Sequence, residues 1–326
     1  MTAPRHDFLS ALAQDIIGPL VHTGQEVAEI SGMAIDDAER LWVELGFPPT
    51  DRHVRSFTDD DVEILRNLRF LQESGLVDID DIIGMTRVLG QALARVATAQ
   101  AQLTGGGLDL TAEGDGPPKK AVEDEIRARV ALTLPMNELF ITYVWRRHLA
   151  ASLRRRFDPR ESEVVGFADL VGYTRLSSHM RQDELPELLA SFQQTANLQV
   201  ATNGGRVLKV IGDAVMFVAP EPEAAAWAAL GIEKTLSLDE SMPPVRIGMS
   251  MGALVSVEGD VYGDTVNRAS RLAELARPDT VLVDDAMGNS LFDCAGISVH
   301  PLRPRKVKGL GLVRAWSVRR ASSSTP

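Results

Sequence analysis

The first half of the chain has apolar residues at the spacing of amphipathic helices. This pattern predicts helices over residues 7–13, 24–29, 35–45, 59–73, 79–97 and 121–155. Pro48–Pro49 and residues 104–118, TGGGLDLTAEGDGPP, interrupt the pattern, and the second interruption has the composition of a mobile loop. We therefore expect a separate all-α N-terminal domain over residues 1–157, ending in a linker helix at about 121–157.

The second half changes to short apolar runs rich in β-branched residues. One run, VVGFADL, contains Asp169 and leads into a glycine-containing turn and a helix. Two more runs, RVLKVI and AVMFV, are joined by Gly212–Asp213, a pair typical of hairpin turns. Residues 260–272, DVYGDTVNRASRL, predict a helix preceded by a strand-to-helix loop that carries Asp260. We expect a second domain of strands and helices over residues 158–326.

Polar residues on these predicted elements suggest phosphate chemistry. Asn267 and Arg271 are four residues apart and therefore share one helix face. A planar guanidinium matches the geometry of a phosphate. Asp169 and Asp213 lie near predicted strand ends, where two carboxylates can hold hard divalent cations such as Mg²⁺ or Mn²⁺. Backbone N–H groups at the start of the helix after Asp169 favour a phosphate.

Each of these residues also has an ordinary structural interpretation. Asp213 is a common hairpin residue, and Asp169 suits a helix N-cap. Lys209 and Arg246 could be solvent-facing charges on strands, and the polar pair on the helix could belong to a solvated face. The functional interpretation depends on the joint occurrence of all these residues at these separations.

Together the segments closely resemble the catalytic domain of class III nucleotidyl cyclases, over roughly residues 160–320. The resemblance implies an α+β catalytic domain with a palm-like, ferredoxin-like βαββαβ core. It also implies an adenylate cyclase, which forms 3′,5′-cyclic AMP and pyrophosphate from ATP with two Mg²⁺ or Mn²⁺ ions per active site. Because the chain carries every polar site position once, the resemblance implies a head-to-tail homodimer with shared active sites.

The resemblance assigns an expected role to each site residue. Asp169, Asp213 and the backbone carbonyl of Leu170 would bind the metals. Asn267 would position the ribose, and Arg271 would stabilise the α-phosphate in the transition state. The expected substrate-binding residues are Lys209, Asp260, Arg246, Gly172, Tyr173, Thr174 and Lys308. Arg246 and the turn 170–174 correspond to triphosphate-binding elements, and Arg305 and Lys306 compete with Lys308 for a late phosphate contact.

The expected base-reading pair favours adenine. Adenine offers an N6 donor and an N1 acceptor, which a carboxylate at Asp260 and an ammonium at Lys209 would match. Guanine reverses this pattern and would require an acceptor in place of Lys209. A site built on hydrogen bonds rejects the wrong base strongly, because its buried polar groups would stay unpaired.

Composition limits the remaining functions. The net charge of -11 argues against a nucleic-acid surface, so no nucleic-acid partner is expected. The lone Cys294 excludes an internal disulfide and fits a reducing compartment. No apolar run reaches the length of a membrane span, and the N-terminus lacks the layout of a signal peptide. We therefore expect a cytoplasmic protein.

The N-terminal domain is expected to regulate the catalytic one. Residues 27–75 loosely resemble the helix-turn-helix layout of MerR-type regulators, but the acidic residues 59–61 oppose DNA binding. Residues 143–157, YVWRRHLAASLRRRF, are basic and could be a solvated linker helix, dock onto an acidic catalytic surface or make a peripheral membrane contact. The alternative function is a non-catalytic sensor or DNA-binding regulator that retains a cyclase-like dimerisation domain.

Overall fold

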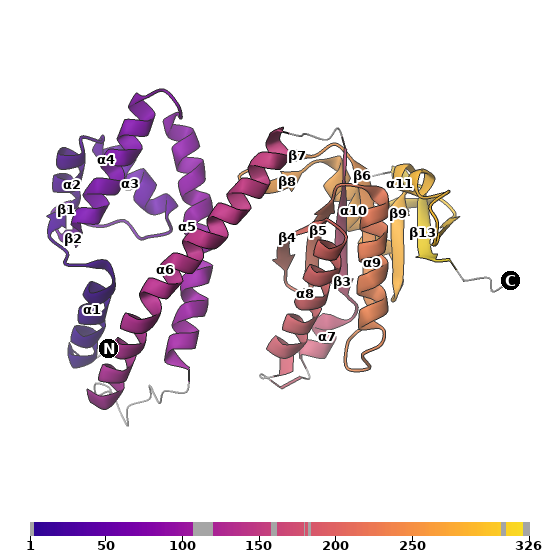
Figure 1. Ribbon diagram of the computed structural model, residues 1–326, viewed down its shortest axis with the longest axis horizontal. Coiled ribbons are helices and arrows are strands. Elements are labelled where there is room, and N and C mark those ends of the chain that lie inside the picture. The colour runs from indigo at the N-terminus through magenta and orange to yellow at the C-terminus, as the bar shows by residue number, and fades with distance from the viewer. Residues whose placement is uncertain are drawn as a thin grey trace. The chain divides into compact units, whose positions relative to one another are not determined.

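The computed structural model describes residues 3–106, 120–157, 162–178, 180–181, 184–307 and 311–321. The chain divides into two compact units, Met1–Phe157 and Asp158–Pro326 (Figure 1). Residues 107–118, most of the expected mobile loop, lie outside the described residues, as does Lys308. Among the described helices, none is both long enough and apolar enough to cross a membrane.

The first unit is built from helices. They are α1 (Ala3–Ile17), α2 (Gly24–Ser31), α3 (Ile35–Glu44), α4 (Asp59–Glu73), α5 (Ile79–Gly105) and α6 (Lys120–Phe157). All the predicted helices are present, and α5 continues into residues 104–105, where the sequence suggested a loop. One small cluster of buried side chains joins α3 to α5 through Leu41, Ile82 and Ile83.

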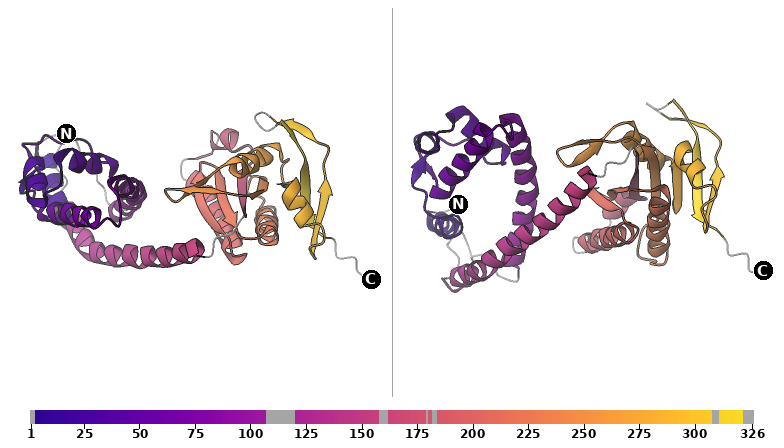
Figure 2. Two further views of the ribbon diagram at one scale, coloured as in Figure 1. Left: turned by 90° about the horizontal axis from the view of Figure 1, so that it is seen from above. Right: turned by 45° about the horizontal axis from the view of Figure 1, so that its top comes forward.

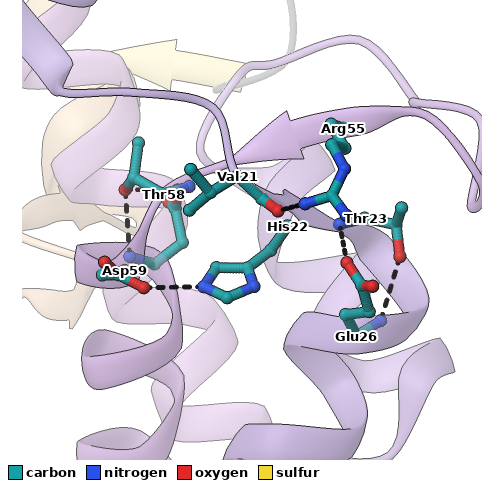
Figure 3. Close-up of polar contacts among 8 residues, drawn as sticks. Val21, His22, Thr23, Glu26, Arg55, Thr58 and Asp59 are labelled. Atoms are coloured by element: carbon teal, nitrogen blue, oxygen red, sulfur yellow. Dashed lines mark hydrogen bonds and ion pairs between the residues drawn. The ribbon is translucent and has the colours of Figure 1, made fainter.

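A short antiparallel ribbon, absent from the prediction, joins β1 (His22–Thr23) to β2 (Arg55–Phe57) in this unit. Figure 3 shows its polar contacts: His22 Nε2 lies 2.7 Å from Asp59 Oδ1, and Arg55 donates to the carbonyl of Val21. The ribbon leads into α2 through a capping box, in which Thr23 Oγ1 accepts from the N–H of Glu26 at 3.2 Å. The ribbon strands are too short to carry a period-2 signal, so the sequence pattern did not reveal them.

The second unit is a mixed sheet with helices on both faces (Figures 1 and 2). Its first part contains β3 (Glu163–Leu170), α7 (Tyr173–Ser177), α8 (Glu184–Thr202), β4 (Arg206–Ile211), β5 (Ala214–Ala219), α9 (Pro222–Leu236) and β6 (Val245–Gly252). Its second part contains β7 (Val255–Val257), β8 (Asp260–Tyr262), α10 (Asp264–Leu275), β9 (Thr280–Asp284), α11 (Asp285–Ser290), β10 (Ile297–Pro301), β11 (Arg305–Val307), β12 (Gly311–Val313) and β13 (Ala315–Arg320).

The seven-stranded sheet has the order β10-β13-β9-β6-β3-β5-β4, which leaves β4 at one edge. The segments β3, α8, β4, β5, α9 and β6 form a βαββαβ core in which neighbouring strands are antiparallel. The predicted α+β fold class is therefore confirmed. Alternate residues of β3 pack into two different clusters, Val164 with residues of α8 and α9, and Val165 with Ala269 of α10.

Helix α10 lies directly on β6 because the strand offers a glycine where the two meet. A Cβ at Gly248 would lie 2.0 Å from the backbone N of Ala273 and 2.6 Å from the carbonyl O of Ala269. Near the other end of the helix, Thr265 Oγ1 donates to the carbonyl of Ala253 at 2.9 Å. These contacts fix the position of α10 on the sheet, and with it the backbone that carries Asn267 and Arg271.

Candidate active site

Two expected metal-binding aspartates lie at neighbouring strand ends. Asp169 is the penultimate residue of β3 and pairs in register with Ala214, the first residue of β5. Asp213 immediately precedes Ala214, and its carbonyl accepts from the N–H of Leu170 at 3.2 Å. Gly212 adopts a φ of 61°, which its lack of a Cβ makes easy, so the β4–β5 turn stays tight. The hairpin therefore brings the second aspartate beside the first.

Asp169 is half-buried and forms an ion pair with Arg246 of β6. Arg246 donates from Nε to Asp169 Oδ2 at 2.6 Å, and Nη2 lies 2.5 Å from the same oxygen. Burial raises the pKa of the Asp169 carboxyl above its ordinary value, the nearby charges of Asp213 and Glu274 add to this, and Arg246 opposes it. The site concentrates negative charge in a poorly solvated place, which favours a cation.

The donor set at this end suits Mg²⁺ or Mn²⁺. The ligands would be the carboxylates of Asp169 and Asp213 with the backbone carbonyl of Leu170, all of them hard oxygen donors. In the described ranges, no group of three or more His, Cys, Asp or Glu side chains gathers at a metal-binding distance.

The expected base-reading pair is in direct contact. Lys209 Nζ on β4 donates to Asp260 Oδ2, although 51 residues separate the two in sequence. The N–H of Val261 donates to Asp260 Oδ1 at 2.9 Å. Burial acts to raise the pKa of Asp260, but the hydrogen bonds from Lys209 and Val261 outweigh it and hold the pKa below its ordinary value. A charged donor and a charged acceptor are thus held side by side.

Asp260 does not lie in a strand-to-helix loop, as the sequence suggested. It is the first residue of β8, which pairs with β7 so that Val257 opposes Asp260 and Val255 opposes Tyr262. The hairpin was missed because each strand has only three residues. Its effect is to hold the carboxylate on a hydrogen-bonded ladder instead of a free loop.

Asn267 and Arg271 occupy the exposed side of α10, as the four-residue spacing predicted. The opposite side of this helix buries Ala269, Leu272 and Ala273. Arg271 Nη1 lies 2.7 Å from both carboxylate oxygens of Glu274. Glu274 was not among the residues predicted for the site, although its spacing of three residues after Arg271 places it on the same helix face.

The expected triphosphate turn follows β3 closely. Gly172 has a φ of 78° and precedes α7, and the N–H of Val171 donates to the carbonyl of Pro244 at 2.8 Å. Tyr173 is partly buried and packs against the main core. The side chain of Thr174 lies outside the described part, like Lys308, whereas Arg305 and Lys306 are exposed on β11.

Comparison with known proteins gives a consistent family. A family model described as the adenylate and guanylate cyclase catalytic domain matches residues 158–319. An adenylate cyclase of Streptomyces coelicolor is 35% identical over 335 residues, which cover 92% of this chain and 86% of the relative. An adenylate cyclase of Streptomyces griseus is 37% identical over 280 residues, covering 83% of this chain and 68% of the relative.

One more relative and one solved structure extend the comparison. A pH-sensitive adenylate cyclase of Mycobacterium tuberculosis is 30% identical over 328 residues, covering 93% of this chain and 79% of the relative. The catalytic core of a rhodopsin-guanylyl cyclase with converted specificity, in complex with ATPαS, shares 26% identity at a TM-score of 0.46. It covers 49% of this chain and 96% of that structure.

Proposed function

The chain belongs to the class III nucleotidyl cyclases, and from this premise we propose that it converts ATP to 3′,5′-cyclic AMP and pyrophosphate. The observation that carries the choice of substrate is the contact between Lys209 and Asp260. The ammonium would donate to adenine N1, and the carboxylate would accept from the N6 amino group. The two Streptomyces relatives, which match most of the chain, are adenylate cyclases, which supports the same choice.

The triphosphate end of the nucleotide would lie near Asp169, Asp213 and Arg246. Class III cyclases depend on divalent metals. We propose that the two aspartates and the Leu170 carbonyl hold two Mg²⁺ or Mn²⁺ ions, which when bound would supply Lewis-acid chemistry at the ribose 3′-hydroxyl and the phosphates. Arg246 would add positive charge for the leaving pyrophosphate, since its guanidinium already lies beside Asp169.

The residues of α10 would act on the transferring phosphoryl group. Asn267 would hydrogen-bond the ribose and align its 3′-oxygen with the α-phosphorus. Arg271 would stabilise the charge that builds on the α-phosphate as the oxygen attacks, which is the main task of protein groups in phosphoryl transfer. Both side chains are exposed in the single chain, where a substrate could reach them.

The active sites would be shared between two copies of the chain. Asp169 and Asp213 would come from one copy, and Lys209, Asp260, Asn267 and Arg271 from the other. We therefore expect Asp213→Ala and Asn267→Ala chains to be inactive separately. Mixing them should restore one intact site per dimer, measured as cyclic AMP formed from ATP and Mn²⁺. Continued inactivity of the mixture would contradict shared sites.

The substrate itself has a direct test. The purified full chain, incubated with Mn²⁺ and either ATP or GTP, should form cyclic AMP and almost no cyclic GMP. Cyclic GMP as the main product would overturn the assignment of the base-reading pair. Absence of both products would overturn the proposed activity.

We also propose that the N-terminal unit regulates the catalytic unit. The relatives match this chain over far more than residues 158–319, so they share sequence with the N-terminal unit too. A shortened chain that begins at Arg160 should differ from the full chain in kcat. Equal kcat values for the two chains over a range of conditions would contradict regulation.

A further inference from the structure

Glu274 contacts two arginines that belong to the proposed phosphate-binding machinery. Its carboxylate oxygens both lie 2.7 Å from Arg271 Nη1. Its backbone carbonyl accepts from Arg246 Nη1 at 3.4 Å. Its negative charge is also close enough to Asp169 to contribute to that carboxyl's raised pKa. Glu274 therefore contacts Arg271 and lies near the ion pair between Arg246 and Asp169 of the same chain.

The backbone at Glu274 is held in place by its neighbours on α10. The residues immediately before it, Leu272 and Ala273, are buried at the point where Gly248 lets α10 rest on β6. The N–H of Ala276, two residues later, donates to the carbonyl of Leu272 at 3.0 Å and so closes the last turn of the helix. Because this backbone is held in place, the Glu274 carboxylate can keep the longer side chain of Arg271 in one position.

The contact uses only part of the guanidinium. A guanidinium carries five N–H donors on Nε, Nη1 and Nη2. Glu274 engages Nη1 alone, so the edge formed by Nε and Nη2 is not used by this contact and can meet a phosphate. Immobilising an arginine costs side-chain entropy, and a contact already made in the free enzyme reduces the entropy that remains to be lost in the transition state.

If the ion pair between Glu274 and Arg271 only stabilised the fold, its contribution would be small. The side chains of Arg271 and Glu274 are 45% and 52% exposed, and exposed ion pairs on a helix surface contribute little to stability. The location of the pair, on the helix face that carries Asn267, is more informative than its contribution to folding.

We propose that Glu274 is a positioning residue for Arg271, holding its guanidinium so that the free edge meets the α-phosphate of the nucleotide. This inference rests on the proposed role of Arg271 in ATP cyclisation. Because Glu274 acts through a transition-state contact, its loss should lower kcat and leave the KM for ATP nearly unchanged.

A double-mutant cycle tests the proposal in the full chain. Glu274→Ala should lower kcat roughly 10- to 100-fold, as expected when a catalytic group is displaced by about 1 Å. Glu274→Gln keeps one acceptor oxygen and should retain more activity than the alanine variant. The double variant Arg271→Ala/Glu274→Ala should be no slower than Arg271→Ala alone, because Glu274 would have nothing left to position.

Two kinetic outcomes would overturn the proposal. Losses that multiply in the double variant would show that Glu274 acts independently of Arg271. A rise in kcat/KM in Glu274→Ala would show that the carboxylate competes with the nucleotide for Arg271. Asp264 provides a matched control, since it is an exposed carboxylate on the first turn of the same helix. Asp264→Asn should keep the wild-type kcat.

A measurement that does not depend on enzyme turnover tests the role of Glu274 separately from the proposed function. Phenylglyoxal modification of Arg271, followed by peptide mass spectrometry, should be faster in Glu274→Ala than in the wild-type chain and unchanged in Asp264→Asn. Equal modification rates in the wild-type and Glu274→Ala chains would overturn the positioning role. Failure of the wild-type chain to form cyclic AMP would instead overturn the proposed function, whatever the modification rates are.

Discussion

Arg246 donates from Nε to Oδ2 of Asp169 at 2.6 Å, across the adjacent strands β6 and β3. The two residues are register partners in the ladder, so their contact follows directly from strand pairing. The ion pair therefore joins an expected triphosphate ligand to an expected metal ligand before any nucleotide binds. Its loss should affect both phosphate binding and the charge state of the carboxyl.

Replacing Arg246 by alanine should lower kcat/KM for ATP and change its pH dependence. We expect roughly a 10- to 100-fold loss at neutral pH, typical of a lost charged contact to the reacting phosphates. Arg246 lowers the pKa of Asp169 against the effect of burial, so its removal should raise that pKa further. The acid limb of kcat/KM should then move to higher pH, because metal binding needs the ionised carboxylate.

The pH profile from 5.5 to 8 provides the measurement for this variant. Arg277→Ala serves as a control, since Arg277 is an exposed cation just beyond the end of α10. Its acid limb should coincide with that of the wild-type chain. An Arg246→Ala profile that is lower but not displaced would contradict the effect on Asp169.

Changing Lys209 to glutamate should weaken the preference for ATP over GTP, without creating a full guanine site, because Asp260 would still present an acceptor to guanine O6. The substitution places an acceptor where guanine offers its N1–H donor, and it leaves adenine N1 facing a carboxylate. We expect the ratio of kcat/KM for ATP to that for GTP to fall by at least about 100-fold, because a site with unpaired polar groups rejects its former substrate strongly. Product assays with each nucleotide measure the ratio, and an unchanged ratio would show that Lys209 does not read the base.

Gly248→Ala should destabilise the second unit through a steric clash. The new Cβ would meet backbone atoms of α10 at 2.0–2.6 Å, and backbone cannot move aside like a flexible side chain. Overpacking of this kind costs about 1–3 kcal/mol or more in the free energy of unfolding. Urea unfolding followed by circular dichroism measures the loss.

Gly204→Ala is the matched control for this clash. Gly204 has a φ of 75° and no neighbour within 4 Å of the Cβ position, so alanine there meets only backbone strain of about 1–2 kcal/mol. Gly248→Ala should also lower kcat at temperatures where the fold persists, since α10 carries Asn267 and Arg271. A wild-type kcat in folded Gly248→Ala would contradict the idea that this contact sets the position of α10.

Glu233→Gln should stabilise the protein at neutral pH. Burial raises the pKa of Glu233 on α9, and the charge of Asp279 raises it further against Lys234 and Arg320. A carboxyl whose pKa is raised by folding supports the folded state below its ordinary pKa of 4.5, and this support is lost as pH rises through the raised value. The variant should therefore have a higher Tm at pH 7 and little advantage at pH 4.

Thermal unfolding at pH 4 and pH 7 measures the change in Tm and shows whether it has the expected direction. Glu240→Gln, at an exposed position soon after α9, is the control and should keep the Tm of the wild-type chain at pH 7. A gain for Glu233→Gln that is larger at pH 4 than at pH 7 would contradict the raised pKa.

The sequence predicted the elements that carry strong local signals. Gly212–Asp213 marks the β4–β5 turn because only a few residue types suit a two-residue hairpin, and the helical spacing of Asn267 and Arg271 marks α10. The helices of the first unit were predicted for the same reason, with errors at their ends. The very short strands β1, β2, β7 and β8 were missed, because two or three residues cannot show a period.

Contacts that depend on tertiary structure were not accessible from sequence patterns. The order of the strands places Arg246 beside Asp169, and the β7–β8 hairpin brings Asp260 to Lys209. Glu274 lies on the predicted helix but was not predicted as a site residue. An acidic residue three positions after an arginine is common on a solvated helix surface. The contacts of Glu274 with Arg271 and Arg246, close to Asp169, become visible only in the three-dimensional structure.

In the part of the chain that the structure describes, strand β4, which carries Lys209, pairs with a neighbouring strand on one side only. A substitution at position 209 would remove the contact with Asp260, but among the described residues no second strand flanks it, and the buried side chains of the sheet lie on other elements. Selection for a different purine could act on such a position at small expense to folding. With the proposed role of Lys209, the scaffold would separate the evolution of nucleotide choice from the maintenance of its core.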